Sequence, residues 1–199
     1  MRCVAYLMML VALAVVLAGC SDDSFVAPDT NPGAVSPTQL MANFNDVYSE
    51  MDIAGYRDLL DDRFLFFFNN GGTLWTKDED LISTGNMFSG EALTNSDGVL
   101  TSAISEIVVD QLLIRGVWEP VLASHSHFGD IPGVQMAVYQ IRFVFMHPSG
   151  TMTVESDQIF YAVPITADGV TQWSLIGQAD VASKSIEHFS WSNIKALFR

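Results

Sequence analysis

The sequence predicts an α+β domain in which N-terminal helices pack on a curved antiparallel sheet. Within residues 36–88, apolar side chains recur at three- and four-residue spacing, which is typical of helices that bury one face. Beyond residue 98 the chain changes to long segments rich in Val, Ile and Phe, separated by turn residues, which is typical of strands. Helices followed by consecutive strands characterise α+β domains, because the helices then cover one face of the sheet.

The first helix is expected to begin at Pro37. Ser36 offers a hydroxyl as N-cap, proline suits the first helical position, and Gln39 is placed to complete a capping box. The apolar residues that follow recur on one helical face: Leu40, Phe44, Val47 and Met51. The pattern therefore predicts an amphipathic helix over about residues 37–51.

Two more helices are expected before the main sheet, with one short strand between them. The second helix starts near Asp52, turns Ile53, Tyr56 and Leu60 inward, and ends around residues 61–63. Residues 64–68 are Phe and Leu and form the strand, which the Asn and Gly residues at 69–72 close. Thr76 and Glu79 form a capping box for the third helix, which extends to about Phe88 and is stopped by Gly90.

The rest of the chain is expected to form an antiparallel meander. Strands are predicted within residues 104–118, 134–146, 152–163 and 172–179. The second and third of these flank His147-Pro148-Ser149-Gly150, which is a turn sequence. A short amphipathic segment over residues 191–198 closes the chain.

The first 20 residues have the pattern of a bacterial export signal. Arg2 is followed by an apolar run over residues 4–17 and then by Ala18-Gly19-Cys20. The run is shorter than the roughly 20 apolar residues that cross a membrane. Residues 17–20 resemble the lipobox of bacterial lipoproteins, which implies cleavage before Cys20 and lipid on its sulfur. The alternative is an ordinary signal peptide whose cysteine is incidental.

Lipid on Cys20 would hold the protein at a membrane, since two or three acyl chains bind far more firmly than one. Ser21 at the next position resembles the sorting pattern of outer-membrane lipoproteins in enteric bacteria. Residues 20–35 are rich in Asp, Pro, Ser and Gly, a composition typical of a flexible tether. We therefore expect a signal peptide over residues 1–19, a lipidated tether over 20–35 and a single domain over 36–199.

Composition excludes several classes of function. Arg2 is the only charged residue of the signal, so eight basic and 23 acidic residues remain after cleavage, a formal net charge of −15. A surface this acidic repels nucleic acid and anionic headgroups. The two cysteines are Cys3 and Cys20, so the domain itself has none and holds no disulfide, cysteine-ligated metal or catalytic thiol.

Several positions carry a resemblance to a known superfamily. They are Phe44 and Tyr48, Tyr56 with Leu59, Leu60 and Phe64, Trp75-Thr76, and Gln172-Trp173-Ser174-Leu175-Ile176. Over residues 37–182 the pattern resembles the nuclear transport factor 2-like superfamily, which includes SnoaL-like and ketosteroid isomerase-like proteins. The resemblance implies a cone-shaped, cystatin-like α+β roll around an apolar pocket. A lipocalin-like barrel or another α+β roll is the competing fold.

The turn at Pro148 decides which side chains share a face of the sheet. With a two- or four-residue loop, Arg142 lies opposite Glu155 or Asp157, on a solvated face where opposite charges pair across strands. A three-residue loop reverses this parity. The other face then collects aromatic residues together with Ser156 and Gln158, whose polar groups need partners or a cavity. We expect these two side chains to be satisfied by backbone or water, or to contact a ligand.

Two carboxylates are candidates for a general base. Asp110 lies in a strand whose two faces are mostly apolar, and a carboxylate enclosed in this way can take up a proton. Asp180, just after the last strand, is the second candidate. Each has the alternative interpretation of an acid that reaches solvent. Tyr56 is placed to donate a hydrogen bond into the pocket, although core packing explains it equally well.

Metal and cofactor sites are not expected. His125 and His127 lie two residues apart, and Asp130 or His147 would have to complete a ligand set. Two histidines in a loop without a defined third ligand are a weak pattern. A nucleophilic triad has no Gly-x-Ser-x-Gly elbow to support it, and no phosphate-binding glycine loop is present.

The sequence favours a lipid-anchored domain of the cell envelope that binds a small apolar ligand or a protein partner. The alternative is an isomerase or cyclase of the ketosteroid isomerase-like class, with Asp110 or Asp180 as the base. The two differ in one requirement: an enzyme needs an enclosed carboxylate aimed into a cavity, whereas a binding module needs only the cavity. The resemblance also implies a homodimer through the sheet. The expected location is the outer membrane of a Gram-negative bacterium.

Overall fold

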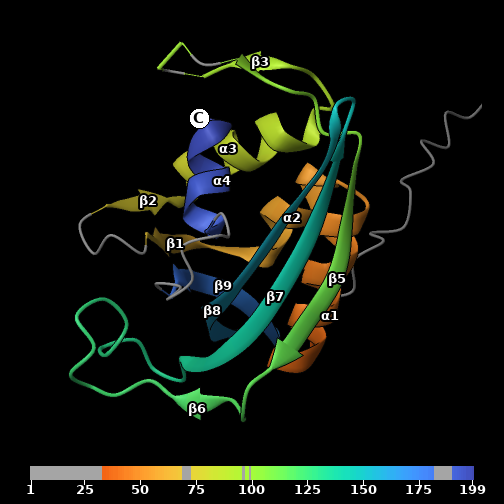
Figure 1. The fold of residues 1–199 in the computed structure, drawn as a ribbon. Coiled ribbons are helices and arrows are strands. Elements are labelled where there is room, and N and C mark those ends of the chain that lie inside the picture. The colour runs from red at the N-terminus through yellow and green to blue at the C-terminus, as the bar shows by residue number, and fades with distance from the viewer. Residues whose placement is uncertain (1–32, 69–72, 96, 99, 182–189) are drawn as a thin grey trace, which may run out of the picture. The chain divides into compact units, whose positions relative to one another are not determined.

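The computed structural model describes residues 33–199 except 69–72, 96, 99 and 182–189 (Figure 1). Residues Gly33–Arg199 form one compact unit. It begins slightly before the predicted start at residue 36, because the backbone of Ala34 pairs with Trp173. The predicted signal peptide, Cys20 and most of the tether over 20–35 lie outside the described residues.

The described residues form four helices: α1 (Pro37–Ser49), α2 (Ile53–Leu59), α3 (Lys77–Phe88) and α4 (Trp191–Leu197). The predicted N-cap of α1 and capping box of α3 are confirmed, whereas the Gln39 side chain accepts from the Val35 amide and does not complete a box with Ser36. Ser36 Oγ accepts a hydrogen bond of 3.1 Å from the Gln39 amide. The Thr76 amide donates to the Glu79 carboxylate at 3.0 Å. Within the described residues, no helix is long and apolar enough to cross a membrane.

The second helix ends earlier than predicted. It stops at Leu59, and strand β1 (Leu60–Phe67) begins at the next residue. Two interactions outweigh helical periodicity here. Leu60 pairs with Leu175 of another strand, and the Asp61 carboxylate accepts from the amide of Arg63 at 2.9 Å. A short acidic side chain that bonds its own neighbouring backbone competes with the helix in this way.

Eight further strands follow β1. They are β2 (Leu74–Thr76), β3 (Leu93–Thr94), β4 (Leu100–Thr101), β5 (Glu106–Ile114), β6 (Glu119–Pro120), β7 (Gln135–His147), β8 (Gly150–Ala167) and β9 (Val170–Asp180). The main sheet has the order β2-β1-β9-β8-β7-β5, with β6 added beside β7. The β3–β4 hairpin forms a separate small sheet.

The predicted α+β class is confirmed, with one correction to the sheet. Neighbouring strands are antiparallel except β1 and β9, where Leu65 pairs in parallel with Gly177. The two strands lie far apart in the sequence, so no local turn fixes their direction. The sheet is therefore mixed, and it curls around the helices (Figure 1).

The register of the β7–β8 hairpin is confirmed. His147 pairs with Gly150, so Pro148 and Ser149 form a two-residue loop, and Arg142 lies opposite Glu155. Side chains therefore alternate between two faces of these strands as predicted. One face packs against the helices, and the other points away from them.

The main core lies between the helices and the inner face of the sheet. We call this unit, the curled sheet with helices α1–α3, the cone. Aromatic rings from both layers fill it, and each is fully buried: Phe44, Tyr48, Tyr56, Phe66, Phe143, Phe145 and Phe160. Helix α4 lies beside α3 and brings Trp191 into the same core, 4.9 Å from the ring centre of Phe143.

A second, smaller core lies on the outer face of the sheet. Phe128, in the loop between β6 and β7, covers Tyr161 and Ile176 with only 1 % of its surface exposed. Its ring rests on Gly177 of β9, where a Cβ atom would meet ring carbons at 2.6 and 2.7 Å. The absence of a side chain at position 177 is therefore what lets the loop close on the sheet.

We expect Gly177→Ala to lower the free energy of unfolding by about 1–3 kcal/mol, because the added methyl group overpacks the ring of Phe128. The measurement is urea denaturation followed by tryptophan fluorescence. In a Phe128→Ala background the same substitution should cost clearly less, since the ring it displaces is gone. Equal losses in both backgrounds would show that the ring of Phe128 does not lie on Gly177.

Candidate functional site

The most unusual feature of the cone is a fully buried lysine. Lys195 of α4 has no exposed surface, and its Nζ lies 2.5 Å from Asp80 Oδ1. The ammonium also donates to Thr84 Oγ1 at 3.0 Å and lies 3.5 Å from the hydroxyl of Tyr56. Two helices of the cone, α2 and α3, thus meet helix α4 at one cation.

Helical spacing explains how the acid reaches this position. Asp80 and Thr84 are four residues apart in α3, so both point from the same inward face. Asp80 lies in the first turn of α3, where the helix dipole favours a negative charge. Tyr56 of α2 completes the arrangement by donating a hydrogen bond of 2.7 Å to Asp80 Oδ2.

Burial changes the protonation of these groups. Desolvation lowers the pKa of Lys195, and the charge and hydrogen bond of Asp80 oppose this shift. Burial raises the pKa of Tyr56 and of Tyr48 well above 10.0, and the negative charge of Asp80 adds to both shifts. The Tyr48 hydroxyl lies near Tyr56 and Thr84, but it makes no hydrogen bond of normal geometry to the described residues.

Aromatic rings surround the same ammonium. Its Nζ lies 5.2 Å from the ring centre of Phe66, 5.4 Å from that of Tyr56 and 5.7 Å from that of Trp191. These distances are within the range of cation–π attraction, which is strongest where water is absent. The ammonium is thus held by a carboxylate, a hydroxyl and three aromatic rings.

The structure brings three of the predicted site residues into a second buried network. Gln158 Nε2 donates to Ser156 Oγ at 2.9 Å and to Asp180 Oδ1 at 2.5 Å. Gln178 Nε2 donates to Gln158 Oε1 at 3.1 Å, and the Ser192 amide of α4 donates to Asp180 Oδ2 at 2.9 Å. Ser156, Gln158 and Asp180 therefore bond one another, and both oxygens of Asp180 accept hydrogen bonds, whereas Gln178 Oε1 is buried without a hydrogen-bond partner among the described residues.

Asp110 lies elsewhere, and its expected apolar enclosure is wrong. Its side chain is 48 % exposed and forms an ion pair of 3.1 Å with Arg142 on the outer face of the sheet. A register shift between Val109 and Gln111 leaves the backbone of Asp110 without a directly opposite residue in β7. Such a bulge changes the direction of the extra side chain, and alternation along the strand cannot predict it.

Tyr56 is a hydrogen-bond donor inside the cone, as the sequence suggested, and its acceptor in this structure is Asp80. His125 and His127 lie in the loop between β6 and β7, on the outer face of the sheet. His125 Nδ1 accepts from the amide of Phe128 at 3.2 Å, so this ring holds the loop together. Among the described residues, no group of three or more His, Cys, Asp and Glu side chains converges as a metal site would require.

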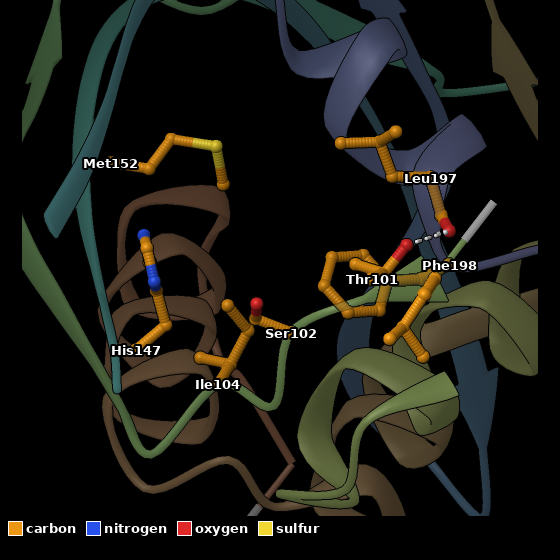
Figure 2. A pocket seen from close by; sticks show the side chains of 8 residues that line it. Thr101, Ser102, Ile104, His147, Met152, Leu197 and Phe198 are labelled. Atoms are coloured by element: carbon orange, nitrogen blue, oxygen red, sulfur yellow. Dashed lines mark hydrogen bonds between the residues drawn. The ribbon is translucent and has the colours of Figure 1, made fainter. Parts of the chain in front are cut away.

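An open hollow lies where α4 ends (Figure 2). Its volume is about 210 Å³, and Figure 2 shows His147 and Met152 facing Thr101, Leu197 and Phe198 across it. The full lining is Leu100, Thr101, Ser102, Ile104, His147, Met152, Leu197 and Phe198. Thr101 Oγ1 donates to the carbonyl of Leu197 at 3.1 Å, so β4 is tied to α4 at the rim.

A second hollow, of about 470 Å³, lies on the surface between α1 and the edge strand β5. Leu112, Leu113 and Ile114 of β5 line it together with Met41 and Asp46 of α1. It is wider and more open than the hollow at α4, and it has no residue of the two buried networks in its lining.

The sequence did not reveal the residues at the centre of the cone. The sequence pattern does not single out Asp80, Thr84 or Lys195 as site residues, because polar and charged residues in helices are usually solvent-facing. A usable pattern does exist: Asp80, Thr84 and Met87 share the face of α3 that contains Phe88. Polar residues at helical spacing on an apolar face indicate a buried partner, although they do not identify it.

Comparison with solved structures gives the same architecture. The chain is similar to a Novosphingobium aromaticivorans protein provisionally named an aromatic ring hydroxylase, with 11 % identity, a TM-score of 0.50, and coverage of 72 % of this chain and 84 % of that one. It is also similar to a nuclear transport factor 2-like superfamily protein of Salmonella enterica, with 8 % identity and a TM-score of 0.49. The match covers 76 % of this chain and 93 % of that one. The chain thus shares with the Novosphingobium protein the α+β fold described above, with helices on a curled mixed sheet.

These similarities concern the fold alone, since identities this low do not carry over a site or an activity. No protein-family model matches the sequence, and neither does any curated protein. The function must therefore be argued from the residues of this chain.

The two buried tyrosines provide a matched test of the network. Tyr56→Phe is expected to cost about 1–3 kcal/mol at pH 7, because it removes the hydroxyl that donates to Asp80 and leaves that oxygen without its donor. Tyr48→Phe should be close to neutral or stabilising, because its hydroxyl is buried without a hydrogen bond.

The same variants should change the response to alkali. Both tyrosines have a folded-state pKa above the value of 10.0 of an unfolded chain, so their contribution to stability is complete below pH 10 and is lost as pH rises above it. Each Phe variant should therefore lose less stability between neutral pH and pH 11, measured by urea denaturation at each pH. An unchanged alkaline slope in both variants would contradict the burial of these hydroxyls.

Proposed function

We propose that this protein is a lipid-anchored lipoprotein of the cell envelope whose domain binds a small apolar group in the hollow at the end of α4. The anchor rests on the sequence pattern at Cys20, and the binding role rests on the hollow in Figure 2. The two parts are independent and have separate tests.

The lining of the hollow supports apolar binding. Ile104, Met152, Leu197 and Phe198 supply aliphatic, thioether and aromatic surface. Ligand pockets typically combine such surface with a few polar groups that orient the ligand, and His147 takes that position here. His147 Nδ1 is hydrogen-bonded to Ser149 Oγ at 2.9 Å.

The size of the hollow limits the ligand. About 210 Å³ is below the ~300–1,000 Å³ typical of pockets for drug-sized molecules. The hollow therefore suits a small molecule with few heavy atoms, or one apolar side chain of a partner protein. In both cases the contact is made at the end of the cone, because α4 and the aromatic rings fill its interior.

The isomerase or cyclase alternative has less support. It requires an enclosed carboxylate with a free path to a substrate. Asp180 is enclosed, but its oxygens accept hydrogen bonds from Gln158 and Ser192. Asp80 is enclosed as well, and Lys195 and Tyr56 hold its oxygens.

The homodimer through the sheet remains a prediction. Outward side chains of β5, β7 and β8 form a polar ladder in which Gln111 bonds Gln140 and Gln140 bonds Glu155. Arg115, directly after β5, extends it by pairing with Asp157. The loop that carries Phe128 covers part of the remaining outer face. A dimer on this face would have to accommodate both features.

The ligand proposal predicts that fluorobenzene, used as the probe, binds the protein and that Ser102→Trp abolishes this binding. Ser102 is exposed and lines the hollow, so an indole there fills the space without disturbing the core. The measurement is broadening of the ¹⁹F resonance of fluorobenzene on titration with protein. Ser105→Trp is the matched control, since Ser105 is an exposed serine outside the lining. Equal broadening with all three proteins would place the probe elsewhere, and no broadening with the wild type would refute the proposal.

The anchor proposal predicts that the full-length chain, expressed in a Gram-negative host, incorporates labelled palmitate and loses residues 1–19. Cys20→Ser should abolish the label and move the protein out of the membrane fraction, because acyl chains need the Cys20 sulfur. Cys3→Ser is the control and should keep the label, since Cys3 is removed with the signal peptide. Mass spectrometry that finds an unmodified Cys20 or an intact N-terminus would overturn the proposal.

A further inference from the structure

The interior of the cone has the chemistry of an ammonium-binding site. Asp80 supplies a negative charge, Thr84 and Tyr56 supply hydroxyl oxygens, and the rings of Tyr56 and Phe66 supply two aromatic walls. These side chains come from α2, α3 and β1. The cation comes from α4, as the side chain of Lys195.

A requirement to fill the cone does not explain this arrangement. Replacing a buried ion pair by apolar side chains of similar volume is often neutral or stabilising by about 1–4 kcal/mol. Leu or Met at positions 80 and 195 would satisfy the packing among Tyr56, Phe66 and Trp191. The cone instead presents a buried acid and two oxygens, which are suited to a group that carries three N–H donors.

Helix α4 fits the site as a separable piece. It is short, with seven residues. Beyond its ion pair, polar side chains of the cone hold its backbone: Ser83 Oγ donates to the carbonyl of Lys195 at 2.7 Å, and Asn86 Nδ2 donates to that of Phe198 at 2.8 Å. The Ser192 amide of α4 also donates to Asp180 Oδ2 at 2.9 Å. Water can take over these bonds to backbone groups when the helix leaves, whereas the carboxylate of Asp80 would need another cation.

The hollow in Figure 2 adjoins this piece. Leu197 and Phe198 form one of its walls, so displacement of α4 would join the hollow to the space that Lys195 and Trp191 occupy. A ligand that enters there would meet apolar and aromatic surface first and the carboxylate of Asp80 last.

We propose that the cone is a binding site for a primary ammonium ion carried on an apolar body, and that Lys195 of α4 occupies this site in place of the ligand. The ammonium of the ligand donates to Asp80, Thr84 and Tyr56. Its apolar body takes the space of the Lys195 methylenes and of Trp191. This site is distinct from the hollow proposed above, which can bind an apolar group while α4 stays in place.

The first test uses the Lys195→Ala variant, which removes three methylenes and the ammonium. The probe is n-propylammonium chloride, which has the same atoms as the deleted group. At about ten times its Kd we expect it to raise the Tm of the variant by about 3–6 °C. Equal concentrations of 1-propanol or sodium chloride should have no such effect, and neither should the ammonium on Lys195→Ala/Asp80→Asn. A variant that folds but shows no selective response to the ammonium overturns the proposal.

The second test uses the wild-type chain and does not depend on the folding of that variant. The probe is 2-phenylethylammonium, whose ring can replace that of Trp191. At about ten times its Kd for the state in which α4 has left the cone, it should accelerate hydrogen exchange of the α4 amides about tenfold, because it raises the population of that state. The neutral 2-phenylethanol should not do so. Unchanged exchange in α4 would show that Lys195 and Asp80 form a permanent ion pair, and the proposal would fail even if the hollow binds fluorobenzene.

Discussion

The ion pair between Lys195 and Asp80 joins the last helix of the chain to the interior of the cone. Each charge requires the other, since an unpaired ion in a space without water costs several kcal/mol. The pair therefore fixes the depth at which α4 sits. It also sets the environment of Tyr56, which donates to the same carboxylate, and of Tyr48 close by. The position of Trp191 has the same cause, because α4 places its ring against those of Phe143 and Phe145.

This placement decides how much space the interior of the cone leaves for a ligand. A cone of this fold encloses space between sheet and helices, and here side chains of its own C-terminal helix take up that space. Space for a ligand is then found at the end of α4, beside Leu197 and Phe198. The buried network around Gln158 has the same origin, since the Ser192 amide of α4 completes the hydrogen bonds of Asp180. Both polar clusters inside the cone thus depend on one short helix.

The outer face of the sheet follows different rules. Register in the β7–β8 hairpin is set by its turn, so the outward position of Arg142 could be deduced from the sequence for a loop of two or four residues, and the structure has two. The exposure of Asp110 could not, because a bulge in β5 turns it toward Arg142. The small core under Phe128 could not be predicted from the sequence either, since it depends on the lack of a side chain at Gly177, which is remote from Phe128 in the chain.

The sequence by itself determined the local features of this protein: the caps of α1 and α3, the succession of helices and strands, the hairpin at Pro148, the α+β class and the pattern around Cys20. Each depends on residues within a few positions of one another, so a single stretch of chain contains the whole cause. Only the tertiary structure decided the parallel pairing of β1 with β9, the surroundings of Asp110, and the meeting of Asp80 with Lys195 across 115 positions of sequence. Such contacts form because burial brings together faces that are remote in the chain, and the free energy of a buried charge depends on what that packing places beside it.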